Sequence, residues 1–322
     1  MFLLFTHQQD YYTIDLVKSS LESSGFEALR LNTDDFPLHI ELTQEFCGTS
    51  SGYIYYNDKR IATNDVQGVW LRKFFSPKVD SSIDEVYRKG CFYESLETLK
   101  GFFYTLNHVT WIDPLDVVSY ASNKLVQLQV AQRVGLRIPR TMVTNNQQDL
   151  RNFYNANNGD IVVKMQTTLS TSMQGGGLFL HTSRVTANDL EDAALVSLCP
   201  LMFQELIEKE YELRVIYVDG AFFAGKMDAS SSKSGQVDCR LAGVDEFCWQ
   251  AYELPQPVML QLDSYMKSMG LLFGAIDLIK SAKGEYVFLE VNPTGEWGML
   301  QRDLNLPIAQ AIASTLIKKA RK

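Results

Sequence analysis

The chain has 322 residues, 46% of them hydrophobic and 21% charged, which is ordinary for a globular protein with two or three packed subdomains. Its formal net charge of −8 argues against a non-specific nucleic-acid binder, because such proteins use a basic stripe to displace counterions. The longest apolar runs, such as Met1–Phe5 and Leu271–Ile276, are far shorter than a membrane span and no signal peptide is recognisable, so we expect a cytoplasmic protein without a membrane partner.

The first 115 residues have the pattern of an open α/β unit. A strand over Phe2–Thr6, an amphipathic helix over Ile14–Ser24 and a strand over Ala28–Asn32 form a compact βαβ unit with parallel strands. The remaining elements expected here are strands at Leu38–Leu42, Tyr53–Tyr56 and Val69–Phe74, and one or two helices within Ile83–Asn107.

The middle of the chain, residues 116–185, is predicted to form a smaller α+β unit. It opens with a helix over Ser119–Val134 that ends at Gly135. Strand Thr141–Thr144, helix Gln147–Ala156 and strand Ile161–Met165 follow. The next loop, Gln166–Gly177, is rich in Ser, Thr and Gly and precedes a strand at Leu178–His181. Such a loop suits a mobile lid over a phosphate, although a flexible hairpin tip explains it as well.

The last part, residues 186–322, combines helices with antiparallel strands. Its expected elements are a helix at Ala187–Leu198, a strand at Met202–Ile207, two strands around Asp219–Gly220, a helix at Pro257–Met269, a hairpin over Gly274–Val291 and a helix at Ile308–Lys319.

The hairpin carries the most informative pattern. If Lys283–Gly284 is a two-residue turn, Asp277 lies directly opposite Glu290, and Asn292 lies on the same face. Opposed like charges are destabilising, so something must offset their repulsion. Two carboxylates and an amide oxygen suit Mg²⁺ beside a nucleotide. A Lys or Arg between the acids, or a solvated surface hairpin, are the alternatives.

Several cations lie where they can meet phosphate groups. Lys164 ends the apolar strand IVVKM just before the Ser/Thr/Gly loop, and Lys124 follows Asn123 in the first turns of a helix. A lysine of this kind, taken alone, is more often a solvated surface charge. Arg214 lies inside the strand YELRVIYV, where an arginine usually faces a partner rather than water.

Competing motifs are absent or out of context. The sequence has neither a GxxxxGK[ST] loop nor a GxGxxG that opens a helix. Gly48–Gly52 matches the string of a nucleophile elbow but leads into a strand rather than a helix. The four histidines lack metal-ligand spacing, although His7 is placed to line a cleft, and the five cysteines never form CxxC and are expected to be reduced.

These residues, in this order, resemble the ATP-grasp superfamily, and within it the peptide ligases that crosslink microviridin-type (graspetide) precursors. The likeness is carried by VQGVWLRKF, NKLVQLQVAQRVGLRIPRTMVTN, CPLMFQELI and, above all, GAIDLI with EYVFLEVNPTGEWGML. The resemblance implies an α/β ATP-grasp fold with three parts: an N-terminal open α/β pre-grasp domain (1–115), a central lid subdomain (116–185) and a C-terminal lobe (186–322).

The resemblance also implies roles for particular residues. Lys124, Lys164 and Arg214 would contact the phosphates of ATP, and the hinge residues Gln204, Glu205, Leu206 and Ile207 would hold the adenine. Asp277, Glu290 and Asn292 would bind Mg²⁺. Arg72 and Arg240 would orient a substrate carboxylate or its acyl phosphate, and Glu191 with Asp192 would dock a basic residue of a leader segment unless they form a solvated helix face.

The implied activity is activation of Asp or Glu side chains of a ribosomal precursor peptide as acyl phosphates, followed by ring closure with Lys as an ω-amide or with Ser or Thr as an ω-ester. The NPTGEWGML segment and the LSTSM loop look more like the amide-forming branch, but Thr171 stands where that branch would have an arginine, so the bond type is open with a preference for amide. Alternatives are a ligase that acts on free amino acids or a protein tail, and a nucleotide-binding regulator without turnover. A homodimer is an open expectation.

Overall fold

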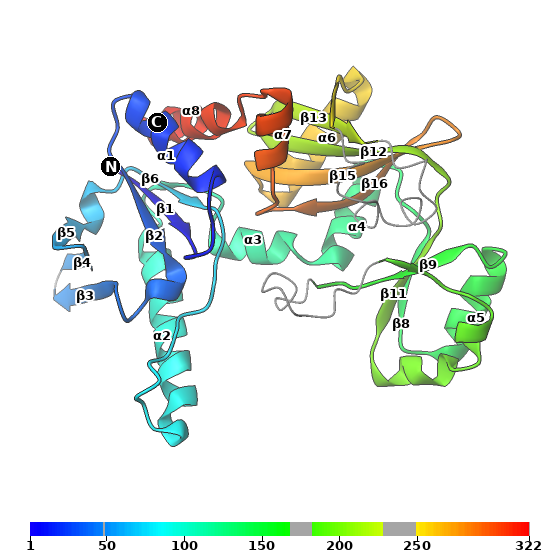
Figure 1. The fold of residues 1–322 in the computed structure, drawn as a ribbon, viewed down its shortest axis with the longest axis horizontal. Helices are drawn as coiled ribbons and strands as arrows, with labels where there is room; N and C mark the ends of the chain where they lie inside the picture. Colours follow the sequence, from blue (N-terminus) through cyan, green and yellow to red (C-terminus); the bar gives the residue numbers. More distant parts are fainter. Residues whose placement is uncertain (48, 168–181, 228–248, 322) are drawn as a thin grey trace.

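The computed structural model describes residues 1–47, 49–167, 182–227 and 249–321. Within these residues the strands form four sheets, and Figure 1 shows the N-terminal sheet on one side of the molecule and the two sheets of the later chain on the other. The fold is mixed α/β, as predicted. Among the described helices, none is long and apolar enough to span a bilayer.

The N-terminal sheet is parallel and has helices on both faces. Its strands are ordered β2 (Ala28–Asn32), β1 (Phe2–Thr6), β6 (Gly68–Leu71) and β7 (Thr110–Ile112). Alternation along β1 places Phe2 and Leu4 against α1 (Thr13–Ser23) and α8 (Ile308–Ala320), and Leu3 and Phe5 against α2 (Glu85–Thr105). The last helix of the chain therefore packs against its first sheet.

A small antiparallel sheet of β3 (Glu41–Cys47), β4 (Thr49–Tyr56) and β5 (Lys59–Ala62) lies beside this unit. The strand predicted over Leu38–Leu42 is displaced, because the backbone N–H of His39 donates to the carbonyl of Asp35 and the turn occupies the first predicted residues. Helix α2 is one continuous helix, begun by Asp84, whose side chain accepts from the N–H of Val86.

The predicted helix over Ser119–Val134 is two helices, α3 (Leu115–Ala121) and α4 (Lys124–Arg133). Asn123 separates them because its extended backbone allows its side chain to accept from the N–H groups of Leu125 and Val126. The break makes Lys124 the first residue of α4.

A second sheet has the order β10 (Ser183–Arg184), β9 (Ile161–Lys164), β11 (Leu201–Glu205) and β8 (Thr141–Thr144), and is covered by α5 (Gln147–Ala156). The predicted helix over Ala187–Leu198 is wrong: the segment forms two 3₁₀ turns, Asn188–Leu190 and Ala193–Leu198. Its buried residues, Leu190, Ala193 and Val196, recur every third position, which is the 3₁₀ rather than the α period. Most of the predicted loop and the strand at Leu178–His181 lie outside the described residues.

The largest sheet has the order β14 (Gln250–Tyr252), β13 (Ala221–Met227), β12 (Lys209–Val218), β15 (Phe273–Ser281) and β16 (Tyr286–Asn292). Helices α4 and α6 (Gln256–Met269) cover one face through Val215, Ile276 and Phe288. A further helix, α7 (Gly298–Leu304), was not predicted. Strand β11 follows the predicted boundary at residue 185, yet it pairs with β8 and β9, which precede that boundary. The second sheet therefore combines strands from two of the predicted parts. The three-part division stays a prediction.

The hairpin of β15 and β16 has a different turn from the predicted one. Ser281 and Glu285 close a three-residue loop in which Gly284 adopts φ +82°, the form with a left-handed third residue. The strand pairs next to the turn are therefore one residue out of the predicted register. A bulge between the pairs of Asp277 and Leu278 returns the strands to the predicted register beyond it. The two differences cancel, so the predicted pairing of Asp277 with Glu290 is confirmed.

Asp113 gives the fold a testable pH dependence. Its carboxylate, 3% exposed, accepts from the N–H groups of Leu272 (2.9 Å) and Phe273 (3.0 Å) where β15 begins. Burial raises the pKa of Asp113 from 3.8 to about 7 despite these hydrogen bonds. The folded state therefore binds more protons than the unfolded chain across this window, and the contribution of Asp113 to the free energy of unfolding falls as the pH rises from about 4 to about 7.

We expect Asp113→Asn to flatten this slope relative to the wild type in urea unfolding measured across the same pH range. Parallel wild-type and variant curves would contradict the assignment.

Candidate active site

The centre of the largest sheet carries a row of charged side chains. Arg214 of β12 lies opposite Asp277 of β15, which lies opposite Glu290 of β16. The Nη1 atom of Arg214 is 2.8 Å from Oδ1 and 2.9 Å from Oδ2 of Asp277. Leu289 is the extra residue at the bulge, so Phe288 and Val291 both face the apolar layer while Glu290 turns to the side of Asp277. The row is thus fixed by strand pairing and by burial behind it.

Helix α4 supports the row from the side. Its first residue, Lys124, forms an ion pair with Glu290. One turn later, Gln127 donates from Nε2 to the carbonyl of Val291 (2.8 Å) and accepts at Oε1 from the N–H of Val291 (3.1 Å). Gln127 therefore holds the backbone between two of the predicted metal ligands, Glu290 and Asn292. Sequence reasoning missed this glutamine.

The two acids have different electrostatic surroundings. Burial raises the pKa of Asp277, and Glu290 adds to this effect while Arg214 opposes it. Burial would also raise the pKa of Glu290, but Lys124 first, then Lys164 and Arg214, hold it below its ordinary value. The repulsion between the two acids is therefore offset here by cations that each pair with one acid, Arg214 with Asp277 and Lys124 with Glu290, whereas the predicted alternative was a single Lys or Arg between them.

The donor set nevertheless fits a divalent cation. Asp277 and Glu290 retain 30% and 36% exposure of their side chains, and Asn292 is exposed on the same strand. Their oxygens are the hard ligands that Mg²⁺ prefers. Among the described residues, no group of three or more His, Cys, Asp or Glu side chains is arranged around a metal position. The predicted set, with two acids and one amide, is of a different kind and stays a prediction.

The remaining predicted nucleotide contacts come from the second sheet. Lys164 ends β9 and its charge helps to lower the pKa of Glu290, so both predicted lysines act electrostatically on the same acid, although only Lys124 forms an ion pair with it. Gln204 is buried and donates to Thr141 Oγ1 (3.0 Å), and Glu205 pairs with Arg137 (2.6 Å). Leu206 and Ile207 continue from β11 towards β12 and are partly buried. The structure thus brings the lysines to the charged row, and the hinge joins the two sheets.

A short segment after β16 connects the row to the N-terminal unit. The backbone carbonyl of Glu296 accepts from Arg214 Nη2 (3.1 Å), and that of Thr294 accepts from Arg72 Nη1 (2.6 Å). A side chain at Gly295 would lie only 3.0 Å from Arg214 Nη2 and 2.4 Å from the Cβ of Ala275, so only glycine fits. This segment, residues 292–296, is called the connecting segment below.

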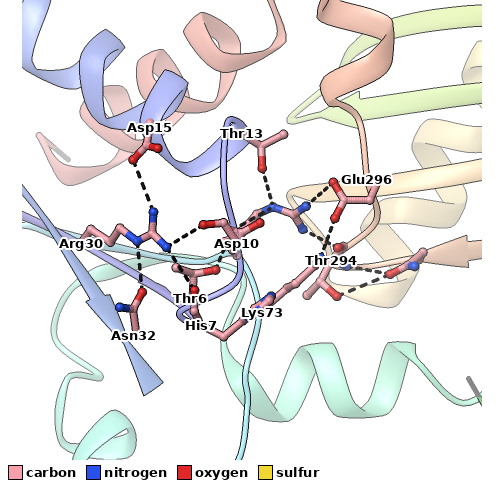
Figure 2. A network of polar contacts seen from close by, with 12 residues as sticks. Thr6, His7, Asp10, Thr13, Asp15, Arg30, Asn32, Lys73, Thr294 and Glu296 are labelled. Carbon is pink, nitrogen blue, oxygen red and sulfur yellow. Dashed lines mark hydrogen bonds and ion pairs between the residues drawn. The ribbon is translucent and has the colours of Figure 1, made fainter. Parts of the chain in front are cut away.

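Arg72 lies where β6 ends and is fully buried. Its Nη2 is 2.7 Å from Glu296 Oε2, and Lys73 Nζ is 2.5 Å from Glu296 Oε1. Burial would raise the pKa of Glu296, but Arg72 and Lys73 hold it below its ordinary value. Arg72 also contacts Thr13 and Asp10, and Figure 2 shows Lys73 and Glu296 near these two residues, so the cluster joins the two halves of the chain.

His7 is buried near this cluster rather than exposed in an open cleft. It is 4% exposed and its ring stacks on that of Phe75 at 3.9 Å between centroids. Burial lowers its pKa, so the imidazole is neutral at neutral pH. Arg30 holds the loop after His7 through the carbonyls of His7 (3.1 Å) and Asp10 (2.6 Å) (Figure 2).

Four predicted residues remain to be placed. Arg240 and Thr171 are outside the described residues. Glu191 and Asp192 are exposed between the two 3₁₀ turns and not on a regular helix, with exposed Leu195 and Leu198 nearby in sequence.

Comparison with known proteins identifies the family of this chain. A family model described as the MvdD pre-ATP grasp domain matches residues 1–119, and one described as a RimK-like ATP-grasp domain matches residues 121–316. The chain belongs to the RimK-like ATP-grasp family. It is an ATP-grasp ligase.

Among solved structures, the macrocyclase MdnB from Microcystis aeruginosa MRC is 43% identical to this ligase, with a TM-score of 0.84 and 98% of each chain covered. Macrocyclase MdnC from the same organism, bound with precursor peptide MdnA, is 31% identical, with a TM-score of 0.88 and coverage of 98% of this chain and 99% of that one. A Chryseobacterium gregarium RiPP-associated ATP-grasp ligase, in complex with ADP and a leader and core peptide, is 29% identical, with a TM-score of 0.92 and coverage of 99% and 96%.

Curated sequences add a second kind of relative. A probable alpha-L-glutamate ligase of Shewanella pealeana is 22% identical over 98% of this chain, and this chain spans 62% of its length. A probable alpha-L-glutamate ligase 1 of Shewanella oneidensis is 20% identical over 96% of this chain and 92% of its own length.

The contacts of Gln127 predict a loss of stability on substitution. Gln127→Leu would leave the buried N–H and carbonyl of Val291 and the carbonyl of Ala121 without their partner, at a cost of about 3 kcal/mol in the free energy of unfolding. Urea unfolding measures this cost. Gln132→Leu, at an exposed position of the same helix, is the control and should change it little. Equal effects of the two substitutions would contradict the role given to Gln127.

Proposed function

We propose that this chain uses ATP and Mg²⁺ to activate side-chain carboxylates of a ribosomal precursor peptide as acyl phosphates, and joins them to Lys as ω-amides or to Ser or Thr as ω-esters. The products are macrocycles, with ADP and phosphate released. The observation that carries the proposal is the pairing of Asp277 with Glu290 beside Arg214 and Lys124, in a chain 43% identical to a macrocyclase over 98% of its length.

The charged row suits phosphoryl transfer. In that reaction a protein mainly aligns the reactants and neutralises the charge that spreads over the phosphate oxygens. Arg214, Lys124 and Lys164 supply positive charge on one side of the largest sheet, each near a carboxylate rather than free in solvent. Asp277, Glu290 and Asn292 would hold Mg²⁺, which neutralises phosphate charge when bound.

The hinge and the connecting segment would place the two substrates on either side of this row. Gln204 to Ile207, between the two sheets, would hold the adenine through backbone groups. Arg72, joined to the row by the connecting segment, would orient the carboxylate to be activated. The acceptor amine or hydroxyl then attacks the acyl phosphate, and phosphate leaves.

A leader segment of the precursor would dock outside this centre. Glu191 and Asp192 are exposed acids beside exposed Leu195 and Leu198, a combination that offers both a charge and an apolar contact to an amphipathic peptide. Titration of Glu191→Gln/Asp192→Asn with a leader peptide tests this assignment.

Arg240 would be a second ligand for the substrate carboxylate. An amide is the bond we expect first.

A second candidate is a ligase that adds free glutamate to a small acceptor or a protein tail. It is favoured by the curated relatives, which are named probable alpha-L-glutamate ligases. ADP release that depends on glutamate alone, without any peptide, would support this candidate and contradict macrocyclisation.

Substitution of the row separates catalysis from folding. Asp277→Asn and Glu290→Gln keep the shape of each side chain but remove its charge, so we expect loss of water elimination from the precursor peptide by protein that still folds, with lowered thermal stability because Arg214 or Lys124 loses its paired anion. Mass spectrometry of the peptide after incubation with ATP and Mg²⁺ measures the first, and circular dichroism the second. Each ring closed removes one water, and mild hydrolysis distinguishes esters from amides.

The control is Glu285→Gln, at an exposed acid next to the hairpin turn, which should ligate like the wild type. Ligation at the wild-type rate by either row variant would contradict the site.

A further inference from the structure

Arg72 and Lys73 stand at a special point of the N-terminal sheet. From β1 the chain passes to β2 on one side and then to β6 on the other, so the strand order reverses between β1 and β6. In open parallel sheets, ligands bind outside the carboxyl ends of the strands at such a point. The N–H groups of Arg72 (2.9 Å) and Lys73 (3.4 Å) both donate to the carbonyl of Phe5, which fixes the two cations at this edge.

The anion that meets them belongs to the other half of the chain and is the most exposed member of the cluster. The side chain of Arg72 is 0% exposed and that of Lys73 is 14% exposed, whereas that of Glu296 is 45% exposed. The cations are therefore fixed parts of the protein interior, and the carboxylate is the part that can leave.

Arg72 would keep its position without the Glu296 side chain. It donates to Thr13 Oγ1 (3.2 Å) and to the carbonyl of Thr294 (2.6 Å), and Asp10 is 4.0 Å away. The oxygens of Thr13 and Thr294 are neutral, and the Asp10 carboxylate is 4.0 Å away, so without Glu296 the charge of the buried guanidinium is only partly balanced, which is costly. Departure of Glu296 therefore creates a prepared seat for another carboxylate.

We propose that Glu296 occupies the seat of the substrate carboxylate, and that Arg72 and Lys73 bind that carboxylate when the Glu296 side chain rotates out. This inference rests on the proposed function and assigns two further residues, Lys73 and Glu296, to substrate selection. The seat adjoins the charged row, because the backbone carbonyl of Glu296 itself accepts from Arg214.

The opposite exchange, in which an acceptor ammonium replaces Lys73 beside Glu296, has less support. It would require the more buried partner to leave and the more exposed one to stay. The lowered pKa of Glu296 agrees with the first exchange, since an ionised carboxylate is the right competitor for another one.

Two small probes test the seat directly. N-acetyl-L-glutamate N-methylamide and its glutamine counterpart are titrated by calorimetry into the full-length wild type and Glu296→Gln. We expect Glu296→Gln to bind the glutamate probe about fivefold more tightly, since a competing half-exposed ion pair has been removed. The affinity for the glutamine probe should not increase. Addition of Lys73→Met to Glu296→Gln should abolish the increased affinity for the glutamate probe.

Equal, weaker or absent binding of the glutamate probe by Glu296→Gln would overturn the proposal. The matched control is Glu27→Gln, an exposed acid at the opposite end of the same sheet that pairs with Lys59; it should leave probe binding unchanged.

Kinetics with the precursor peptide give an independent outcome. The seat predicts a lower KM for Glu296→Gln at similar kcat, whereas a large loss of kcat would make Glu296 a catalytic residue and overturn the proposal. Failure of the proposed function is recognised separately, as wild-type protein that eliminates no water from the peptide while the probe titration still reports on the seat.

Discussion

The contacts of Arg214 connect the parts of this molecule that must act together. One nitrogen of its guanidinium bonds both oxygens of Asp277, and another bonds the backbone carbonyl of Glu296. The first contact sets the charged row in the sheet, and the second ties the connecting segment to it. Because a planar guanidinium holds both directions at once, a lysine could not replace it. The position of Arg72 and its substrate seat depends on this segment.

The charges around Arg214 are balanced in pairs, and the pairs are held by different elements. Asp277 has Arg214 on the neighbouring strand, and Glu290 has Lys124 on α4 and Lys164 on β9. Binding of nucleotide phosphates with a divalent ion would exchange these partners, because the cations would turn to phosphate and the acids to the metal. A network of this kind keeps a polar site folded without ligand and leaves its groups ready for one.

Much of this site follows from the sequence, for identifiable reasons. Period-two alternation placed Asp277 against Glu290, and strand burial placed Arg214 beside a partner. The turn was wrong, but the bulge at Leu289 restored the register, because burial of both Phe288 and Val291 requires an extra residue between them. A turn near Gly284 was predictable from its glycine, whereas its length was not.

Other contacts had no local signal. Gln127 meets Val291 across 164 residues, and Lys73 meets Glu296 across 223, so neither partner is visible in a window of sequence. The 3₁₀ turns after Ala187 were mistaken for an α-helix because apolar residues at a spacing of three fit both periods over one short segment. The close approach of the connecting segment to Arg214, which leaves room only for glycine at position 295, was likewise not predicted.

We propose above all that Asp277 and Glu290 together bind a divalent ion beside a nucleotide. Electron paramagnetic resonance of Mn²⁺ in the presence of ADP measures this most directly, with Mn²⁺ in place of Mg²⁺. We expect ADP-dependent Mn²⁺ binding by the wild type, weakened by at least about tenfold when both acids are replaced by their amides. Unchanged Mn²⁺ affinity in that double variant would contradict it.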